Sequence, residues 1–223
     1  MKNIKAIIFD MDGTIIDTED IWKKATRNLI EKRGIQYTPE LEKEIEKYIR
    51  GIGLREGCKL IKEIVKLDDH LHDLMAEKEK HANQLYREGV KFIDGFLEFH
   101  KKAIALNLNT AIATNADPTT VAVTDEVLNL RKIFGKHIYD ISHVNFVPKP
   151  HPDLYLYVAD IFKHDPSECI AIEDSAHGAA AAKSAGMTCI GINTSKNPKQ
   201  LEKCDLIIDQ YHEFDLNKLK KEK

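Results

Sequence analysis

Short apolar runs of strand length recur along the chain, with stretches of helical periodicity between most of them. The first run covers residues 4–9 and reads Ile-Lys-Ala-Ile-Ile-Phe. A nearly continuous apolar run is typical of a strand that is buried on both faces, as in a parallel sheet. Similar runs lie at 109–114, 169–173, 188–192 and 205–208. Strands that alternate with helices predict an α/β fold with a doubly wound parallel sheet.

The first two predicted strands are about a hundred residues apart, far more than a single crossover helix needs. We expect four helices and no strand in this gap. The first carries Ile21, Trp22, Ala25, Leu29 and Ile30 on one face, the second begins at Thr38 and Pro39, the third runs from about Leu54 to Leu67, and the fourth starts at Leu71. We therefore predict a core of residues 1–16 and 90–223 and an inserted helical domain of residues 17–89. Its two crossings lie at 15–18 and 89–94.

Composition narrows the class of protein. The 223 residues include 33 basic and 36 acidic side chains, well interspersed, with a formal net charge of −3, so nothing points to nucleic acid or a membrane surface as a partner. No segment reaches the roughly 18 apolar residues of a membrane span, and the N-terminal apolar run is too short and too acidic for a signal peptide. The four cysteines lie far apart without a C-x-x-C pair, which suits buried thiols in a reducing compartment. We expect a cytoplasmic monomer.

Two carboxylates, Asp10 and Asp12, directly follow the first predicted strand, and Gly13 allows the backbone to turn beside them. In open α/β sheets, ligands bind at the carboxyl ends of the strands, so acids placed there are candidates for chemistry. Asp-Gly is also a common turn dipeptide, and the pair alone fits an ordinary turn equally well.

Three further polar fragments follow other predicted core elements: Thr114-Asn115, Lys149-Pro150 and Glu173-Asp174. Carboxylates gathered from two strand ends are the ligand set of a hard cation, and Mg²⁺ usually takes one or two of them. Ser175 is a good N-cap for a helix of residues 176–185, where Gly178 allows close packing.

The order and spacing of the four fragments resemble the signature motifs of the haloacid dehalogenase superfamily, over residues 4 to about 210. The helical insertion resembles the cap of its β-phosphoglucomutase-like branch. The resemblance implies a Rossmann-like core and a Mg²⁺-dependent phosphoryl transfer through an aspartyl phosphate. Asp10 is then the nucleophile and a metal ligand. Asp12 is the general acid and base and a metal ligand through its backbone carbonyl. Asp174, with Glu173 as an open addition, completes the metal site, and Thr114, Asn115 and Lys149 bind the phosphate.

Hydrolysis of a small phosphomonoester, such as a sugar phosphate, is the function that we expect. The alternatives are a β-phosphoglucomutase-type phosphomutase and a non-catalytic binding protein that keeps the fold. The mutase resemblance implies a His on the first cap helix, but residues 19–33 contain none and Trp22 stands at about that position. Arg50 and Arg55 lie in a segment that resembles the specificity loop of the branch, although a turn with surface arginines fits equally well. We expect the cap to open and close about its two crossings.

Overall fold

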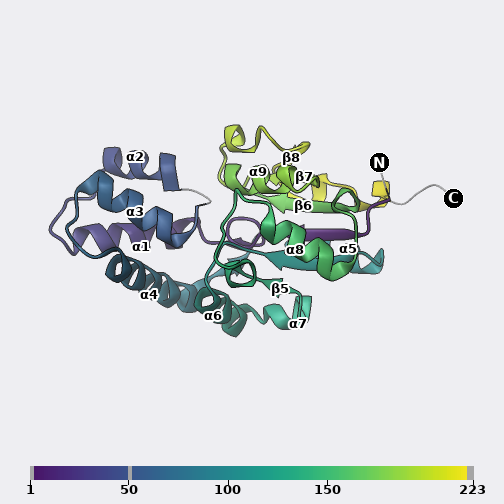
Figure 1. Ribbon diagram of the computed structural model, residues 1–223, viewed down its shortest axis with the longest axis horizontal. Coiled ribbons are helices and arrows are strands. Elements are labelled where there is room, and N and C mark those ends of the chain that lie inside the picture. Colours follow the sequence, from purple (N-terminus) through teal and green to yellow (C-terminus); the bar gives the residue numbers. More distant parts are fainter. Residues whose placement is uncertain (1–2, 50–51, 220–223) are drawn as a thin grey trace.

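The computed structural model describes residues 3–49 and 52–219. Its core is a six-stranded parallel sheet in the order β5-β4-β1-β6-β7-β8, which confirms the predicted α/β fold (Figure 1). The strands are β1 (Ala6–Phe9), β4 (Asn109–Ala113), β5 (Ile138–Tyr139), β6 (Cys169–Glu173), β7 (Thr188–Ile192) and β8 (Leu206–Ile208). The strand β5 was not predicted, because two residues are too few for an apolar pattern to be recognised.

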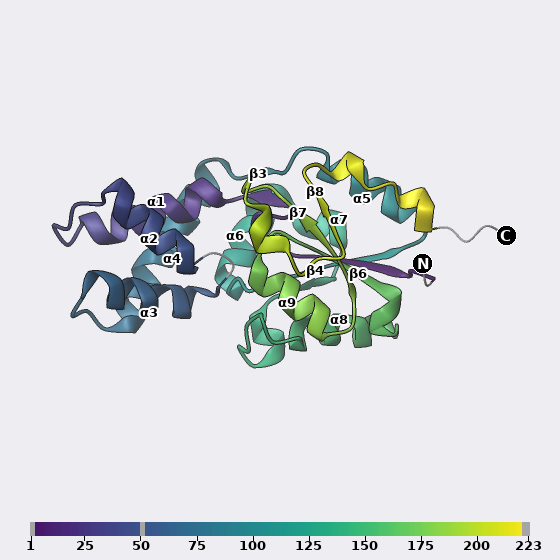
Figure 2. The ribbon, with the colours of Figure 1, turned by 90° about the horizontal axis from the view of Figure 1, so that it is seen from above.

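Side chains of β1 alternate between two apolar layers. Ile7 and Phe9 lie in one layer, and Ala6 and Ile8 in the other. Helices α5 (Phe96–Ala105), α6 (Pro118–Leu128) and α7 (Leu130–Phe134) contribute to the first layer, and α8 (Asp153–Phe162) and α9 (Ala176–Ser184) to the second. Figure 2 shows α5 and α9 on opposite sides of the sheet. Layers on both faces explain why the central strands read as continuous apolar runs.

Four helices form a separate bundle at the end of the molecule opposite the termini (Figure 1). They are α1 (Glu19–Glu31), α2 (Pro39–Ile49), α3 (Leu54–Val65) and α4 (Leu71–Gly89). Leu29, Ile45 and Ile61 are among the residues of their common apolar core. The helix α3 ends two residues earlier than expected, because Lys66 adopts a left-handed conformation with φ of 55°. We call this bundle the cap.

The expectation of four helices and no strand between β1 and β4 was wrong in two respects. The strand β2 (Ile16–Asp17) pairs antiparallel with β3 (Lys91–Phe92), so the two crossings to the cap are hydrogen-bonded to each other. The gap also contains α5, which covers the sheet. Strands of two residues are defined only by their partner, and the partners here are about 75 residues apart in sequence, beyond the reach of any local pattern.

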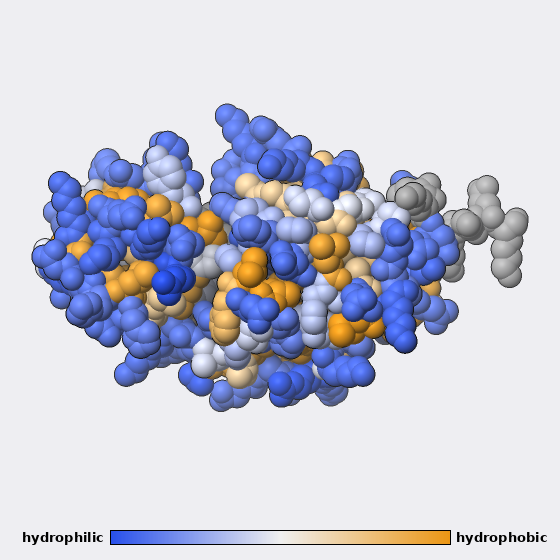
Figure 3. Space-filling model, in the orientation of Figure 1, coloured by the Kyte–Doolittle hydropathy of each residue, from blue (hydrophilic) through white to orange (hydrophobic). Residues whose placement is uncertain are grey.

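The face in Figure 3 is mostly hydrophilic, with small separate apolar patches. Of the helices within residues 3–49 and 52–219, none combines the length and the apolar character that crossing a membrane requires.

Candidate active site

The candidate site lies where β1, β4 and β6 end. Phe9 is in register with Ile112 of β4 and Ile172 of β6, so the three strands finish at nearly the same level. The loops that follow them therefore meet at one edge of the sheet. The predicted residues Asp10, Asp12, Thr114, Asn115, Lys149 and Asp174 all line a cavity of about 570 Å³ there. Its other wall comes from the cap, and its volume falls in the range of small-molecule sites.

Lys149 is the central cation of the site. Its Nζ donates hydrogen bonds to Asp10 Oδ1 at 2.6 Å, to Glu173 Oε1 at 2.6 Å and to the carbonyl oxygen of Ala113 at 2.8 Å. These three bonds use the full donor capacity of an ammonium group. Burial opposes the charge, but the carboxylates of Asp10 and Glu173 outweigh it and raise the pKa of Lys149. The lysine is therefore a fixed positive charge that holds the two acids in place.

Asp10 lies at the floor of the cavity and is 8% exposed. Burial raises its pKa well above the usual range; Lys149 opposes the rise, while Glu173 and Asp174 add to it. Three carboxylates against one ammonium leave an excess of negative charge, so another cation at this point would favour the ionised form of Asp10.

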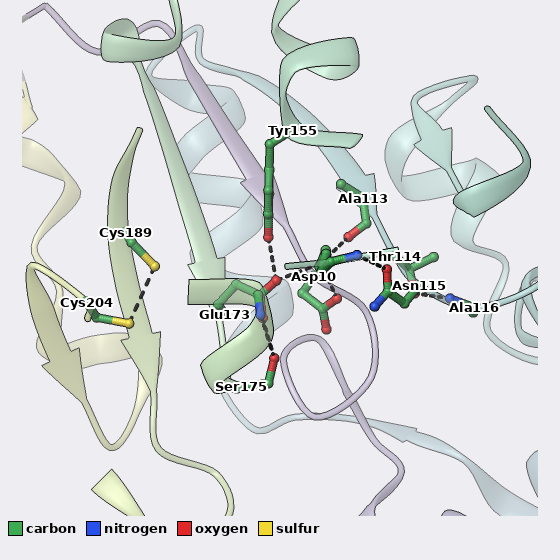
Figure 4. Close-up of polar contacts among 12 residues, drawn as sticks. Asp10, Ala113, Thr114, Asn115, Ala116, Tyr155, Glu173, Ser175, Cys189 and Cys204 are labelled. Atoms are coloured by element: carbon green, nitrogen blue, oxygen red, sulfur yellow. Dashed lines mark hydrogen bonds and ion pairs between the residues drawn. The ribbon is translucent and has the colours of Figure 1, made fainter. Parts of the chain in front are cut away.

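Glu173 is completely buried and both of its oxygens are engaged (Figure 4). Oε1 accepts from Lys149 and, at 2.6 Å, from the Tyr155 hydroxyl, while Oε2 accepts from Ser175 Oγ at 3.2 Å. Ser175 also accepts from the backbone N–H of Gly178, which confirms its predicted capping role. A Cβ at Gly178 would lie 1.9 Å from Glu173 Cδ, so only glycine fits there. Through these hydrogen bonds, Glu173 fixes the positions of Lys149, Tyr155 and Ser175.

The donor set fits a divalent cation. Carboxylate oxygens of Asp10, Glu173 and Asp174 lie within 4.8 Å of one another. Gly13, with φ of +76°, lets the loop approach Asp174 closely, since a Cβ there would be 2.3 Å from Asp174 Oδ2. Because Glu173 is engaged by protein donors on both oxygens, Asp10 and Asp174 are better placed to bind a metal directly. Oxygen ligands of this kind suit Mg²⁺.

Asp12 faces the cap. Its Oδ1 accepts hydrogen bonds from Trp22 Nε1 at 3.2 Å and from the Tyr86 hydroxyl. Trp22 belongs to α1 and Tyr86 to α4, so two cap helices reach the acid of the core loop. Sequence analysis placed Trp22 near the site but did not single out Tyr86, which lies in the apolar stripe of α4.

The predicted phosphate-binding residues are held by local bonds. Thr114 Oγ1 accepts from the backbone N–H of Ala116 at 3.0 Å, which leaves its own hydroxyl hydrogen for another acceptor. Asn115 Oδ1 accepts from the backbone N–H of Lys149 at 2.9 Å and so links the loop after β4 to the Pro-rich loop.

Lys78 is a site residue that sequence analysis missed. It lies on α4, lines the cavity and is 4% exposed. Within the described part of the chain it has no carboxylate partner; its Nζ lies 5.6 Å from the centre of the Trp22 ring. Burial lowers its pKa. The sequence does contain a signal for it, because this lysine lies in the apolar stripe between Leu74 and Ala82, where burial of an unpaired charge is unfavourable.

Of the two predicted specificity residues, Arg50 lies outside the described residues. Arg55 is exposed on α3 and is absent from the lining of the cavity, although its neighbour Leu54 is present. The position of Arg55 gives no support to a role in specificity, which stays a prediction from the sequence.

Comparisons with known proteins identify the family of the chain. The family model of haloacid dehalogenase-like hydrolases matches residues 4–186. A phosphorylated carbohydrates phosphatase of Thermotoga maritima is 29% identical over 184 residues, 82% of each chain. The 6-phosphogluconate phosphatase of Escherichia coli is 30% identical over 195 residues, 84% of this chain and 81% of the relative. A hydrolase structure from Deinococcus radiodurans, with bound phosphate and sodium, superimposes with a TM-score of 0.73 at 26% identity, covering 96% and 94% of the two chains.

Proposed function

The chain belongs to the haloacid dehalogenase-like hydrolases and is a phosphoric monoester hydrolase. We propose that it hydrolyses a phosphorylated carbohydrate through an aspartyl phosphate on Asp10. The observation that carries the proposal is the buried pair of Asp10 and Lys149 at the floor of a cavity whose other wall comes from the cap.

In the first step, an oxygen of Asp10 forms a bond to phosphorus as the bond from phosphorus to the ester oxygen breaks. Lys149 would orient the nucleophile, because it holds Asp10 Oδ1 at 2.6 Å and so makes Oδ2 the attacking oxygen. The Thr114 hydroxyl and the Asn115 amide lie on the same wall and would bind oxygens of the transferred group. Positioning and charge neutralisation of this kind account for most of the catalysis in phosphoryl transfer.

The ester oxygen leaves with the electron pair of the broken bond and takes a proton from the Asp12 carboxyl. Water then attacks the phosphorus, the bond to Asp10 breaks, and Asp12 takes back a proton from that water. Splitting the transfer through a covalent intermediate and supplying the proton locally are two established sources of rate acceleration.

Asp10 and Asp174 would hold Mg²⁺, with the backbone carbonyl of Asp12 as a further ligand and Glu173 as support. When bound, the ion neutralises charge on the phosphate and on the crowded carboxylates. The acidic cluster and the close approach of Gly13 to Asp174 support this assignment.

The substrate class follows from the cap wall of the cavity. Lys78 is a buried cation that faces this space, so an anionic group at the far end of the substrate would match it. A sugar phosphate with a carboxylate or a second phosphate has such a group. The comparison with a 6-phosphogluconate phosphatase supports an acidic sugar phosphate. Arg50 and Arg55 stay candidates for specificity on sequence grounds.

Hydrolysis is favoured over a mutase reaction. The cap donors beside Asp12 are an indole and a phenol, and no histidine is among the residues that line the cavity in the described part of the chain. The four free cysteines support the further proposal of a reducing, cytoplasmic setting. We also propose a monomer, as expected from the sequence.

A panel of phosphomonoesters assayed for phosphate release with Mg²⁺ tests the proposal. We expect activity that EDTA abolishes and Mg²⁺ restores, and a loss of about 10⁴-fold or more in kcat for Asp10→Asn. With a hexose 1-phosphate, free phosphate should appear without the 6-phosphate isomer. Full activity in EDTA, or an active Asp10→Asn variant, would contradict the mechanism, and accumulation of the isomer would identify a mutase.

A further inference from the structure

We propose that Tyr86 is a positioning residue that, with Trp22, aims the carboxyl group of Asp12 from the cap side. The inference rests on the proposed function, since it concerns the residue that protonates the leaving oxygen. Tyr86 is fully buried on α4, and its hydroxyl donates a hydrogen bond to Asp12 Oδ1.

Both cap donors bind the same oxygen of Asp12. Trp22 Nε1 donates to Oδ1 at 3.2 Å, and the Trp22 and Tyr86 rings meet edge to face, with centroids 6.3 Å apart. Within the described residues, no hydrogen bond from a protein group reaches Oδ2. Two donors from different helices on Oδ1 fix the rotation of the carboxyl group, so Oδ2 is the oxygen presented to the cavity that Asp12 lines.

The hydroxyl of Tyr86 also lies at the junction between cap and core. Tyr86 belongs to a buried apolar cluster that also contains Ile15, Ile16 and Ala82, so its hydroxyl needs a polar partner, and Asp12 supplies one. A phenylalanine would pack equally well against this apolar wall. The structure therefore assigns the hydroxyl to the contact with Asp12 rather than to packing.

This arrangement makes the direction of Asp12 depend on the position of the cap. The donors to Oδ1 come from α1 and α4, whereas Asp12 itself lies on the loop after β1.

The dependence on the leaving group separates this role from a purely structural one. An alkoxide leaving from a sugar phosphate needs a proton as the bond from phosphorus to oxygen breaks, whereas a nitrophenolate is stable without one. Loss of correct aim in Asp12 will lower kcat/KM for the sugar phosphate and spare kcat/KM for the nitrophenyl ester, because the hydrolysis of the aspartyl phosphate that both esters share comes after the leaving group has departed. Damage to the fold, to the nucleophile or to phosphate binding will slow both.

The experiment measures kcat/KM for the best sugar phosphate from the panel and for p-nitrophenyl phosphate. It compares wild type, Tyr86→Phe, Trp22→Phe and the control Tyr139→Phe. Tyr139 is also a buried tyrosine with a hydrogen-bonded hydroxyl, but its contact is to His137 on the edge of the sheet. We expect Tyr86→Phe to lower kcat/KM roughly tenfold or more for the sugar phosphate and about twofold at most for the nitrophenyl ester, part of the full effect of a general acid. The control should resemble wild type on both substrates.

An equal loss on both esters, or no loss on either, would overturn the proposal. If Tyr86→Phe does not fold, as judged by circular dichroism, Trp22→Phe decides by the same comparison, because it removes the second donor to Oδ1. A wild-type protein that hydrolyses neither ester would instead refute the proposed function, so the wild-type and variant results test the two claims separately.

Discussion

Removal of the Lys149 charge is expected to destabilise the protein strongly even though it deletes only one polar group. In Lys149→Met, the ion pairs of its Nζ with Asp10 and Glu173, both at 2.6 Å, are lost together. The two carboxylates stay buried, at 8% and 0% exposure, without their cation. Methionine has nearly the volume of the lysine stem, so the change tests charge rather than packing.

The magnitude follows from the geometry. At 2.6 Å and an effective dielectric constant of about 20, each pair is worth roughly 6 kcal/mol before desolvation is counted. Burial of each ion costs several kcal/mol, and loss of one partner of a buried pair is typically destabilising by about 3–5 kcal/mol. We expect a decrease of that size in the free energy of unfolding at pH 8.

The assay is urea denaturation followed by circular dichroism, with linear extrapolation to water. The control is Lys183→Met, which also removes a 2.6 Å pair, with Asp205, but one whose side chains are 37% and 44% exposed. A surface pair of this kind is worth about 1 kcal/mol at most.

The loss should also depend on pH. Without Lys149, burial raises the pKa of Asp10 further, and the cost of its charge is present above that raised value. As the pH falls toward the unfolded pKa of about 3.9, Asp10 takes up a proton and the cost disappears. The difference between wild type and variant should therefore shrink from pH 8 to pH 5. A loss no larger than that of the surface control, or one that grows on acidification, would refute the reasoning.

Three further outcomes are expected. Lys78→Met should raise KM about tenfold or more for a sugar phosphate with a second anionic group, because such a substrate reaches the cap. The KM for p-nitrophenyl phosphate should stay within about twofold of wild type. Equal changes in KM for both substrates would show that Lys78 does not determine specificity. Mg²⁺ at about 100 times its Kd should stabilise the wild type against thermal unfolding by roughly 2.7 kcal/mol. Gly13→Ala should lose most of this Mg²⁺-dependent stabilisation, because its Cβ would lie 2.3 Å from Asp174 Oδ2. Burial lowers the pKa of His100 to about 4, so the free energy of unfolding should fall by up to about 3 kcal/mol between pH 6.5 and 4, as the unfolded chain takes up the proton first. His100→Phe should lack this slope; a variant with the same slope would assign it to other groups.

The fold class, and the edge of the sheet at which the candidate residues lie, follow from the order of the amino acids alone. Apolar runs mark strands that are buried on both faces, and parallel strands place their following loops at one edge of the sheet. Asp10, Thr114 and Asp174 are therefore expected to lie together from the sequence alone. Capping by Ser175 is also predictable from the sequence, because it depends only on a residue three positions away, Gly178.

The ion pairs and hydrogen bonds that cross the molecule depend instead on how distant segments pack together. Lys149 bonds to an acid 139 residues away, Tyr86 reaches Asp12 across 74 residues, and the strands β2 and β3 exist only as each other's partner. In the sequence, Lys78 is one polar residue that interrupts an apolar helix face. Only the packed structure shows that it lines the cavity from the cap side. Patterns of strand and helix arise from the chain's nearest neighbours, whereas a site depends on how distant segments pack, and no local period records that packing.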